Sequence, residues 1–310
     1  MPRRETGFFD ALIDDGRPLL SVTGLALVFS GCFALFVSAH QQFLPHDVQF
    51  LGASAAQLSA IAEGRVAYFM FHDRVAFGGA ILAVGLLYLW LAALPLAQGE
   101  RWAWWAFAGS GLLGFGSFLT YLGYGYLDSW HGTATLALLP LFLLGLWRSH
   151  TLVRDSAWPR RTLDSWGRRA RLGRVLLLFT GVGMILAGGT IMFLGITAVF
   201  VPQDLAYMGV TPEDLTAFNP RLVPLIAHDR AGFGGGVASC GVLVLFCVWF
   251  AQPSRSLWQV LTLSGVFGFG TAIGVHFVIG YTDWFHLAPA FAGLAIYLAG
   301  LAMSIVGRSE

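Results

Sequence analysis

The sequence predicts an all-α polytopic membrane protein, with eight transmembrane helices arranged as two parallel four-helix repeats. Composition predicts the membrane fold, because 56% of the 310 residues are apolar and only 11% are charged, and the mean hydropathy is +0.70. The apolar runs are long and unbroken, which favours helices over a β-barrel built from short alternating strands. An internal sequence repeat predicts the division into two halves.

Eight apolar runs are long enough to cross a hydrocarbon core, which takes about 20 helical residues. We expect the first run to stay in place as an anchor, because it is too long for the apolar region of a cleavable signal peptide. The lipid bilayer is therefore the first partner that the sequence predicts. The runs cover residues 19–39, 76–98, 103–127, 130–147, 175–201, 231–251, 257–281 and 285–306.

The two halves of the chain share three motifs in the same order. The middle motif reads FMFHDRVAFGGA at 69–80 and LIAHDRAGFGGG at 225–236, an offset of 156 residues. Upstream, FLPHDVQFLG precedes the first copy and FVPQDLAYMG precedes the second; downstream, GYLDSWH pairs with GYTDWFH. Because each half has an even number of spans, both halves point the same way across the membrane. We expect a first repeat at 1–147, a basic linker at 148–174 and a second repeat at 175–310.

The arginines predict the orientation, since the chain contains no lysine. Fourteen of the 18 arginines fall on one side of the eight spans, which the positive-inside rule assigns to the cytoplasm. The other four are Arg65, Arg74, Arg221 and Arg230, all within the repeated region. This predicts insertion in the inner (cytoplasmic) membrane with both termini cytoplasmic.

The repeated polar residues then lie on the outer side, at the predicted ends of helices. The HDR motif is expected to open the second helix of each half, and the D-x-x-H motif to join the third and fourth helices. Each half therefore supplies two histidines, two acids and an arginine at one depth. These residues are His72, Asp73, Arg74, Asp128 and His131, with His228, Asp229, Arg230, Asp283 and His286 as their counterparts.

Imidazole and carboxylate groups suit zinc, iron or manganese, and a facing histidine pair suits a haem iron. The sequence thus predicts a transition metal or haem for redox chemistry near the outer leaflet. His72 with His131, and His228 with His286, are the expected cofactor-binding pairs. The metal-ligand candidates are His72, Asp128, His131, His228, Asp283 and His286. The expected supporting residues are Asp73, Arg74, Asp229, Arg230, Arg65, Arg221, His46, Tyr126 and Tyr281.

Two other classes of function stay open. The polar set also suits a structural ion network, with Arg74 pairing to Asp73 or Asp128, in a non-catalytic subunit that meets a membrane-complex partner or a second copy of itself. A transporter of a small solute or ion would need polar groups at mid-membrane, and these are sparse. His276 lies alone in a predicted span, which is more typical of a hydrogen-bonded core residue than of a ligand. The chain carries no nucleic-acid-binding pattern.

Overall fold

A computed structural model describes residue 7 and residues 13–126, 129–159 and 167–304, with the side chains of 129–131 left out. These residues form helices and no strand, and eight of the helices are long and apolar enough to cross a membrane. The predicted all-α polytopic fold is therefore confirmed, and the protein is an integral membrane protein.

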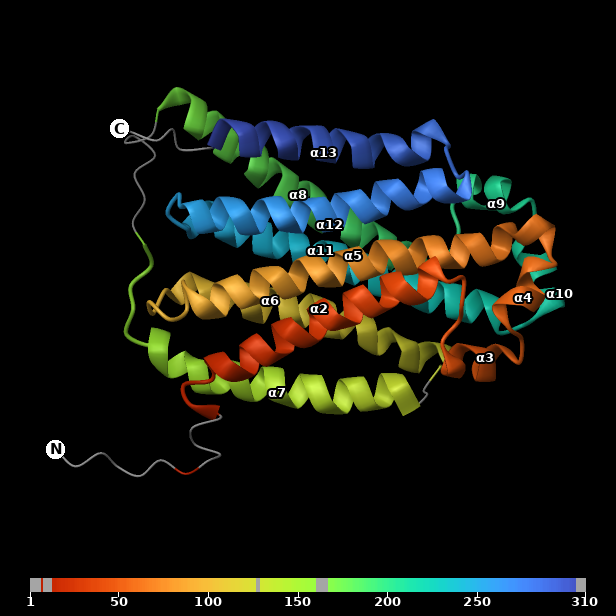
Figure 1. Ribbon diagram of the computed structural model, residues 1–310, viewed down its shortest axis with the longest axis horizontal. Helices are drawn as coiled ribbons and strands as arrows, with labels where there is room; N and C mark the ends of the chain where they lie inside the picture. Colours follow the sequence, from red (N-terminus) through yellow and green to blue (C-terminus); the bar gives the residue numbers. More distant parts are fainter. Residues whose placement is uncertain (1–6, 8–12, 127–128, 160–166, 305–310) are drawn as a thin grey trace.

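Twelve α-helices and two short 3-10 helices (η) follow one another along the described chain (Figure 1). In chain order they are α2 (Arg17–Ala39), α3 (Pro45–Leu51), α4 (Ala55–Ser59), η1 (Ala62–Gly64), α5 (Arg65–Ala93), α6 (Arg101–Phe118), η2 (Leu119–Tyr124), α7 (Ser129–Val153), α8 (Arg168–Ile196), α9 (Pro202–Met208), α10 (Pro212–Phe218), α11 (Leu222–Phe250), α12 (Arg255–Ile279) and α13 (Trp284–Ser304).

Helices α5 and α11 form the centre of the bundle. In each, 67% of the most apolar window is buried, against 22% to 33% in the other six spanning helices. α5 packs on α2 and α12, whereas α11 packs on α8 and α6. Glycines permit the closest of these approaches: Gly31 of α2 lies against Gly78 of α5, and Gly188 of α8 lies against Gly234 of α11.

Both central helices begin earlier than their apolar runs predicted. The runs start at residues 76 and 231, but α5 begins at Arg65 and α11 at Leu222. The HDR motifs therefore lie about two turns inside their helices and do not open them. The helices continue through these charged residues because each charge is paired within the bundle, which removes the cost of placing it there.

Four short helices, α3, α4, α9 and α10, cover one end of the bundle, here named the capped end (Figure 1). Two of these helices begin at a capping side chain: the Ser54 hydroxyl accepts from the backbone N–H of Gln57 at 3.3 Å, and the Thr211 hydroxyl accepts from that of Asp214 at 3.2 Å. Both described ends of the chain lie at the opposite end of the bundle (Figure 1). α7 and α8 extend into the expected linker, whose residues 160–166 lie outside the described part.

Candidate metal centre

Arg74 of α5 forms ion pairs with α3 and α11 beneath the capped end. Its guanidinium donates to Asp47 of α3 at 2.5 Å and to Asp229 of α11 at 2.9 Å. Asp47 also accepts from the hydroxyl of Tyr126 and, at 3.2 Å, from the backbone N–H of Leu44 at the start of α3. One carboxylate thus caps a surface helix and neutralises a buried cation.

Arg230 makes the matching set of contacts on the other side. It donates to Asp204 of α9 at 2.6 Å and to Asp73 of α5 at 3.3 Å. Asp204 accepts from the hydroxyl of Tyr281 at 2.8 Å and from the backbone N–H of Val201 at 2.8 Å. The two arginine networks are therefore crossed, because each central helix supplies the arginine of one and an acid of the other.

The pairing differs from the expected one. The sequence suggested Asp73 or Asp128 as the partner of Arg74, but Arg74 contacts Asp47 and Asp229, and Asp128 lies outside the described residues. Successive residues of a helix point about 100° apart. Arg74 and Asp73 therefore face different neighbours, and Asp73 reaches Arg230 of α11 instead.

The network also sets the charge state of Asp47 at the capped end. Burial would raise the pKa of Asp47, but the charge of Arg74, the adjacent His46 and the hydrogen bond from Tyr126 outweigh it, so the pKa is lowered. Burial and the neighbouring Asp47 carboxylate raise the pKa of Tyr126. The pair is therefore an ionised carboxylate that accepts a hydrogen bond from a neutral phenol.

Acid should weaken the protein partly through Asp47. Its pKa is lowered in the folded state, so its stabilising contribution is complete above the ordinary aspartate pKa of about 3.9 and is lost as the pH falls through the lower folded value. We expect the melting temperature to fall more steeply below about pH 4 in the wild type than in Asp47→Asn. The pKa of Asp214 is also lowered, by hydrogen bonds from Thr211, but Asp214 is present in both proteins, so its effect cancels when the two melting curves are compared. Equal acid slopes would contradict this role.

Three histidines from three different helices meet beside the Arg230 network. They are His72 of α5, His276 of α12 and His286 of α13, and their ligand atoms all lie within 4.8 Å of one another. The Nε2 atoms of His72 and His276 are 3.0 Å apart. His72 and His276 are buried and His286 is half-buried. We name these three residues the histidine trio.

Each member of the trio has a hydrogen-bond partner for its Nδ1 atom. His72 Nδ1 is 3.0 Å from the carboxylate of Asp73, and His276 Nδ1 is 2.6 Å from the backbone carbonyl of Ala272. His286 Nδ1 is 3.1 Å from the hydroxyl of Tyr281. Carboxylates and backbone carbonyls are usual outer partners of metal-bound histidines, because they orient the ring and fix its tautomer. The Tyr281 hydroxyl donates its hydrogen to Asp204, so its oxygen can accept from His286 in the same way. Nε2 is then the nitrogen left for a ligand in every ring.

The short contact between Nε2 of His72 and Nε2 of His276 favours a proton or a cation at this pair. A carbonyl oxygen only accepts, so Nδ1 of His276 carries the hydrogen, and Nε2 of the neutral ring is an acceptor. The carboxylate of Asp73 imposes the same tautomer on His72. Two acceptor nitrogens 3.0 Å apart repel each other, and a proton on one of them or a metal ion bound to both removes this repulsion. The chemistry of the donor set therefore suits a cation.

The trio only partly matches the predicted ligand sets. His72 was expected beside His131, but the structure places it beside His276 and His286, while the side chain of His131 lies outside the described residues. His228 was paired with His286; instead, its ring lies 5.3 Å from the ring of Tyr126. Asp283, an expected ligand, accepts from the backbone N–H of His286 at 2.8 Å and so begins α13.

Three further residues of the expected supporting set do not contact the trio. Arg65 forms an exposed ion pair with Glu63 at 2.6 Å. Arg221 is also exposed and donates to the backbone carbonyl of Phe50 at 2.6 Å. His46 is buried, with its Nε2 atom 3.5 Å from Asp47. These residues belong to the capped end and to the Arg74 network.

Sequence reasoning missed three residues that complete this region. His276 was interpreted as a lone core histidine because it has no counterpart in the first half. Asp47 and Asp204 occupy equivalent positions in the repeated PHD and PQD motifs, so the repeat itself carried the signal that both acids have a shared role. Each of the three residues contacts a different segment of the chain: His276 contacts His72, Asp47 contacts Arg74 and Asp204 contacts Arg230.

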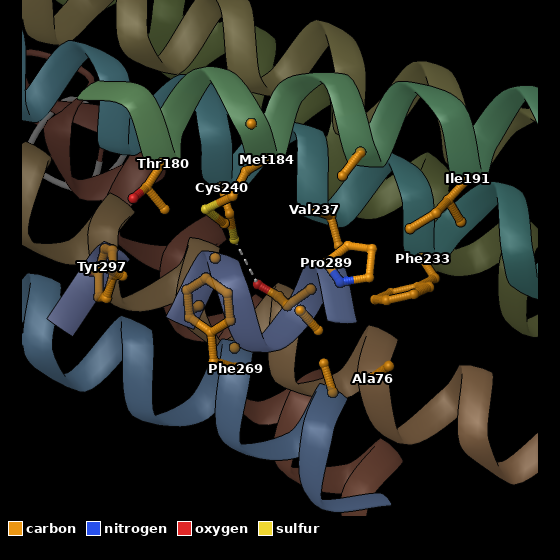
Figure 2. A pocket seen from close by; sticks show the side chains of 18 of the residues that line it. Ala76, Thr180, Met184, Ile191, Phe233, Val237, Cys240, Phe269, Pro289 and Tyr297 are labelled. Atoms are coloured by element: carbon orange, nitrogen blue, oxygen red, sulfur yellow. Dashed lines mark hydrogen bonds between the residues drawn. The ribbon is translucent and has the colours of Figure 1, made fainter. Parts of the chain in front are cut away.

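An elongated cavity of about 630 Å³ extends from the trio into the membrane-spanning part of the bundle. Figure 2 shows side chains of α8, α11 and α12 around it, with Met184, Val237 and Phe269 among them. Apart from the polar groups at the trio, most of its lining is apolar. Its volume is within the usual range of ligand pockets, about 300–1,000 Å³.

No protein-family model, curated protein or solved structure matches the chain. Fold and site together define the class: an integral membrane helical bundle with a histidine cluster beneath one end.

Proposed function

We propose that the protein binds one first-row transition-metal ion through the Nε2 atoms of His72, His276 and His286, and uses it in chemistry near the outer leaflet. The observation that carries this proposal is that all three Nδ1 atoms are engaged by separate partners. Three imidazoles suit zinc, iron or copper. The positive-inside rule supports a cytoplasmic position for the arginine-rich end of the bundle and therefore an outer position for the trio.

The spacing of the nitrogens favours a single ion over a haem. Metal–nitrogen bonds of 2.0–2.1 Å in a tetrahedral site separate two ligand nitrogens by about 3.3 Å. Two axial histidines on opposite sides of a haem iron would be about 4 Å apart. The Nε2 atoms of His72 and His276 are 3.0 Å apart, close to the single-ion value, and the ligand atom of His286 lies within 4.8 Å of the other two.

The residues around the trio have separable roles. Asp73 orients His72, the Ala272 carbonyl orients His276, and Tyr281 orients His286. Three protein ligands leave at least one coordination position for an outside molecule, as in catalytic zinc sites. When bound, such an ion supplies Lewis-acid or, if it is iron or copper, redox chemistry. His72, His276 and His286 all line the cavity, so an incoming molecule can approach the trio from there.

Elemental analysis tests the proposal. Protein purified without chelators in lipid nanodiscs should hold about one transition-metal ion per chain, as three histidines form one site. After chelation, cobalt should restore one equivalent and give the visible absorption of a low-coordinate site. Folded protein that neither holds nor rebinds a metal would instead favour a proton shared by His72 and His276, within a structural ion network.

The role of Tyr281 has an internal control. Tyr281→Phe removes the hydroxyl beside His286, and loss of an outer partner typically weakens metal binding by about 10- to 100-fold. Tyr126→Phe removes the equivalent hydrogen bond, to Asp47, in the Arg74 network. We expect the metal dissociation constant to increase only in Tyr281→Phe. Equal effects of the two substitutions would mean that Tyr281 acts on stability alone.

A further inference from the structure

The cavity beside the trio is lined over several turns of α5. On α5 its wall runs from His72 through Ala76, Ala80 and Ala83 to Leu87. These residues recur every three or four positions along one helix face and span about 22 Å of the helix axis. The cavity therefore reaches from the trio deep into the membrane.

Polar groups able to bind a ligand are concentrated at one end of the cavity. Asp73 and Arg230 join the trio there. Further along, the hydroxyls of Thr180 and Thr190 donate to carbonyls of their own helix at 3.0 and 2.9 Å, and Ser264 donates to the carbonyl of Ala83 at 3.4 Å. These hydroxyls are already satisfied, so the long part of the cavity offers an apolar wall.

The wall between α8 and α13 provides a route from the bilayer. At the end away from the caps, Gly173 of α8 lies against Gly300 of α13, but further along Gly188 lies against Gly234 of α11. α8 contacts α11 near both of its ends, through Arg174 and Gly195, and diverges from α13 as it approaches the capped end (Figure 1). On the two helices that diverge, residues of the cavity lining are exposed: Gly183, Ala187, Thr190, Pro289 and Ala292.

We infer that the cavity binds a single-tailed membrane amphiphile whose hydroxyl or carbonyl oxygen lies at the histidine trio and whose hydrocarbon tail lies along α5 and α12. The polar end matches an oxygen head group, the apolar length matches a tail, and the exposed lining between α8 and α13 matches entry from lipid. The contact between the head group and a metal rests on the proposed function. The tail site does not depend on it.

Photolabelling in nanodiscs tests this inference. The probe is a long-chain primary alcohol with a diazirine in its tail, and the matched control is the corresponding alkane without the hydroxyl. We expect the alcohol to label lining residues of α5, α8 and α12, with about tenfold less labelling by the alkane, because only the alcohol can satisfy the polar end. Equal labelling by the two probes would show that the cavity holds any lipid chain, and would overturn the inference.

Glycine pairs provide matched variants. A Cβ atom at Gly268, in the lining, would meet only Ala83 at 4.0 Å, and one at Gly270 on the same helix would meet nothing within 4 Å. Gly268→Phe should fill the cavity and remove the labelling, and Gly270→Phe should keep it. Gly183→Phe and Gly189→Phe repeat this comparison on α8, since neither Cβ would meet an atom within 4 Å and only Gly183 lines the cavity. Labelling that survives both lining variants would contradict the inference.

Metal content measured on the same samples separates the two proposals. Gly268→Phe should keep its metal while losing the probe. Metal-containing protein without head-dependent labelling would overturn the amphiphile site alone. Metal-free protein with head-dependent labelling of the cavity would overturn the metal site and leave the amphiphile site standing.

Discussion

Arg230→Met should destabilise the protein by about 3–5 kcal/mol, the usual cost of removing one partner of a buried ion pair. Arg230 is 7% exposed, and its partners Asp73 and Asp204 are 2% and 0% exposed. Methionine fills much of the same space but leaves two buried carboxylates without their cation. The free energy of unfolding, measured by denaturant titration in mixed micelles, gives the magnitude.

A matched surface pair provides the control for this loss. Arg65 pairs with Glu63 at 2.6 Å, but the two side chains are 45% and 80% exposed. Exposed ion pairs contribute about 0–1 kcal/mol, so Arg65→Met should have little effect. Adding Asp73→Asn and Asp204→Asn to Arg230→Met should recover part of the stability, because the uncompensated charges are then removed. A loss below about 1 kcal/mol in Arg230→Met would contradict the buried network.

His276→Ala should abolish tight metal binding. The substitution removes the ring whose Nε2 atom is 3.0 Å from that of His72. Only two of the three proposed histidine ligands then remain. Because loss of an outer partner alone weakens a metal site by about 10- to 100-fold, loss of a ligand should weaken it by more than about 100-fold. Competition with a chelator of known affinity measures the change in dissociation constant.

The control for this substitution is another histidine outside the trio. His40 is exposed and its Nδ1 atom contacts the carbonyl of Phe36 at 2.8 Å, so His40→Ala should leave the metal content unchanged. Circular dichroism and the melting temperature establish that both variants are folded. Full metal retention in folded His276→Ala would exclude the trio as the binding site.

Much of the architecture was predictable because lipid imposes a simple rule. A spanning segment must satisfy its own backbone, so long apolar runs become helices, and all eight runs did so. The starts of α5 and α11 were predicted too late because hydropathy begins an apolar run only after charged residues such as Asp73 and Arg74. Their burial depends on partners from other helices, which hydropathy does not include.

The sequence predicted which types of residue form the site better than it predicted which of them contact each other. The repeat singled out Arg74 and Arg230, and each of them does pair with an acid of the other central helix. It also suggested contacts within each half, whereas His72 meets His276 and His286, and Arg74 meets Asp229. Which helices pack against each other is set by close approaches such as Gly31 with Gly78, and the sequence alone does not state which partner a small-residue face selects.

The central claim is that His72, His276 and His286 bind the same metal ion. X-ray absorption at the metal edge tests this claim most directly. Zinc-loaded wild-type protein should show three imidazole nitrogens at 2.0–2.1 Å, and zinc added to His276→Ala should show fewer. A spectrum dominated by oxygen ligands, or identical imidazole scattering in the two proteins, would contradict the assignment of the trio as the metal centre.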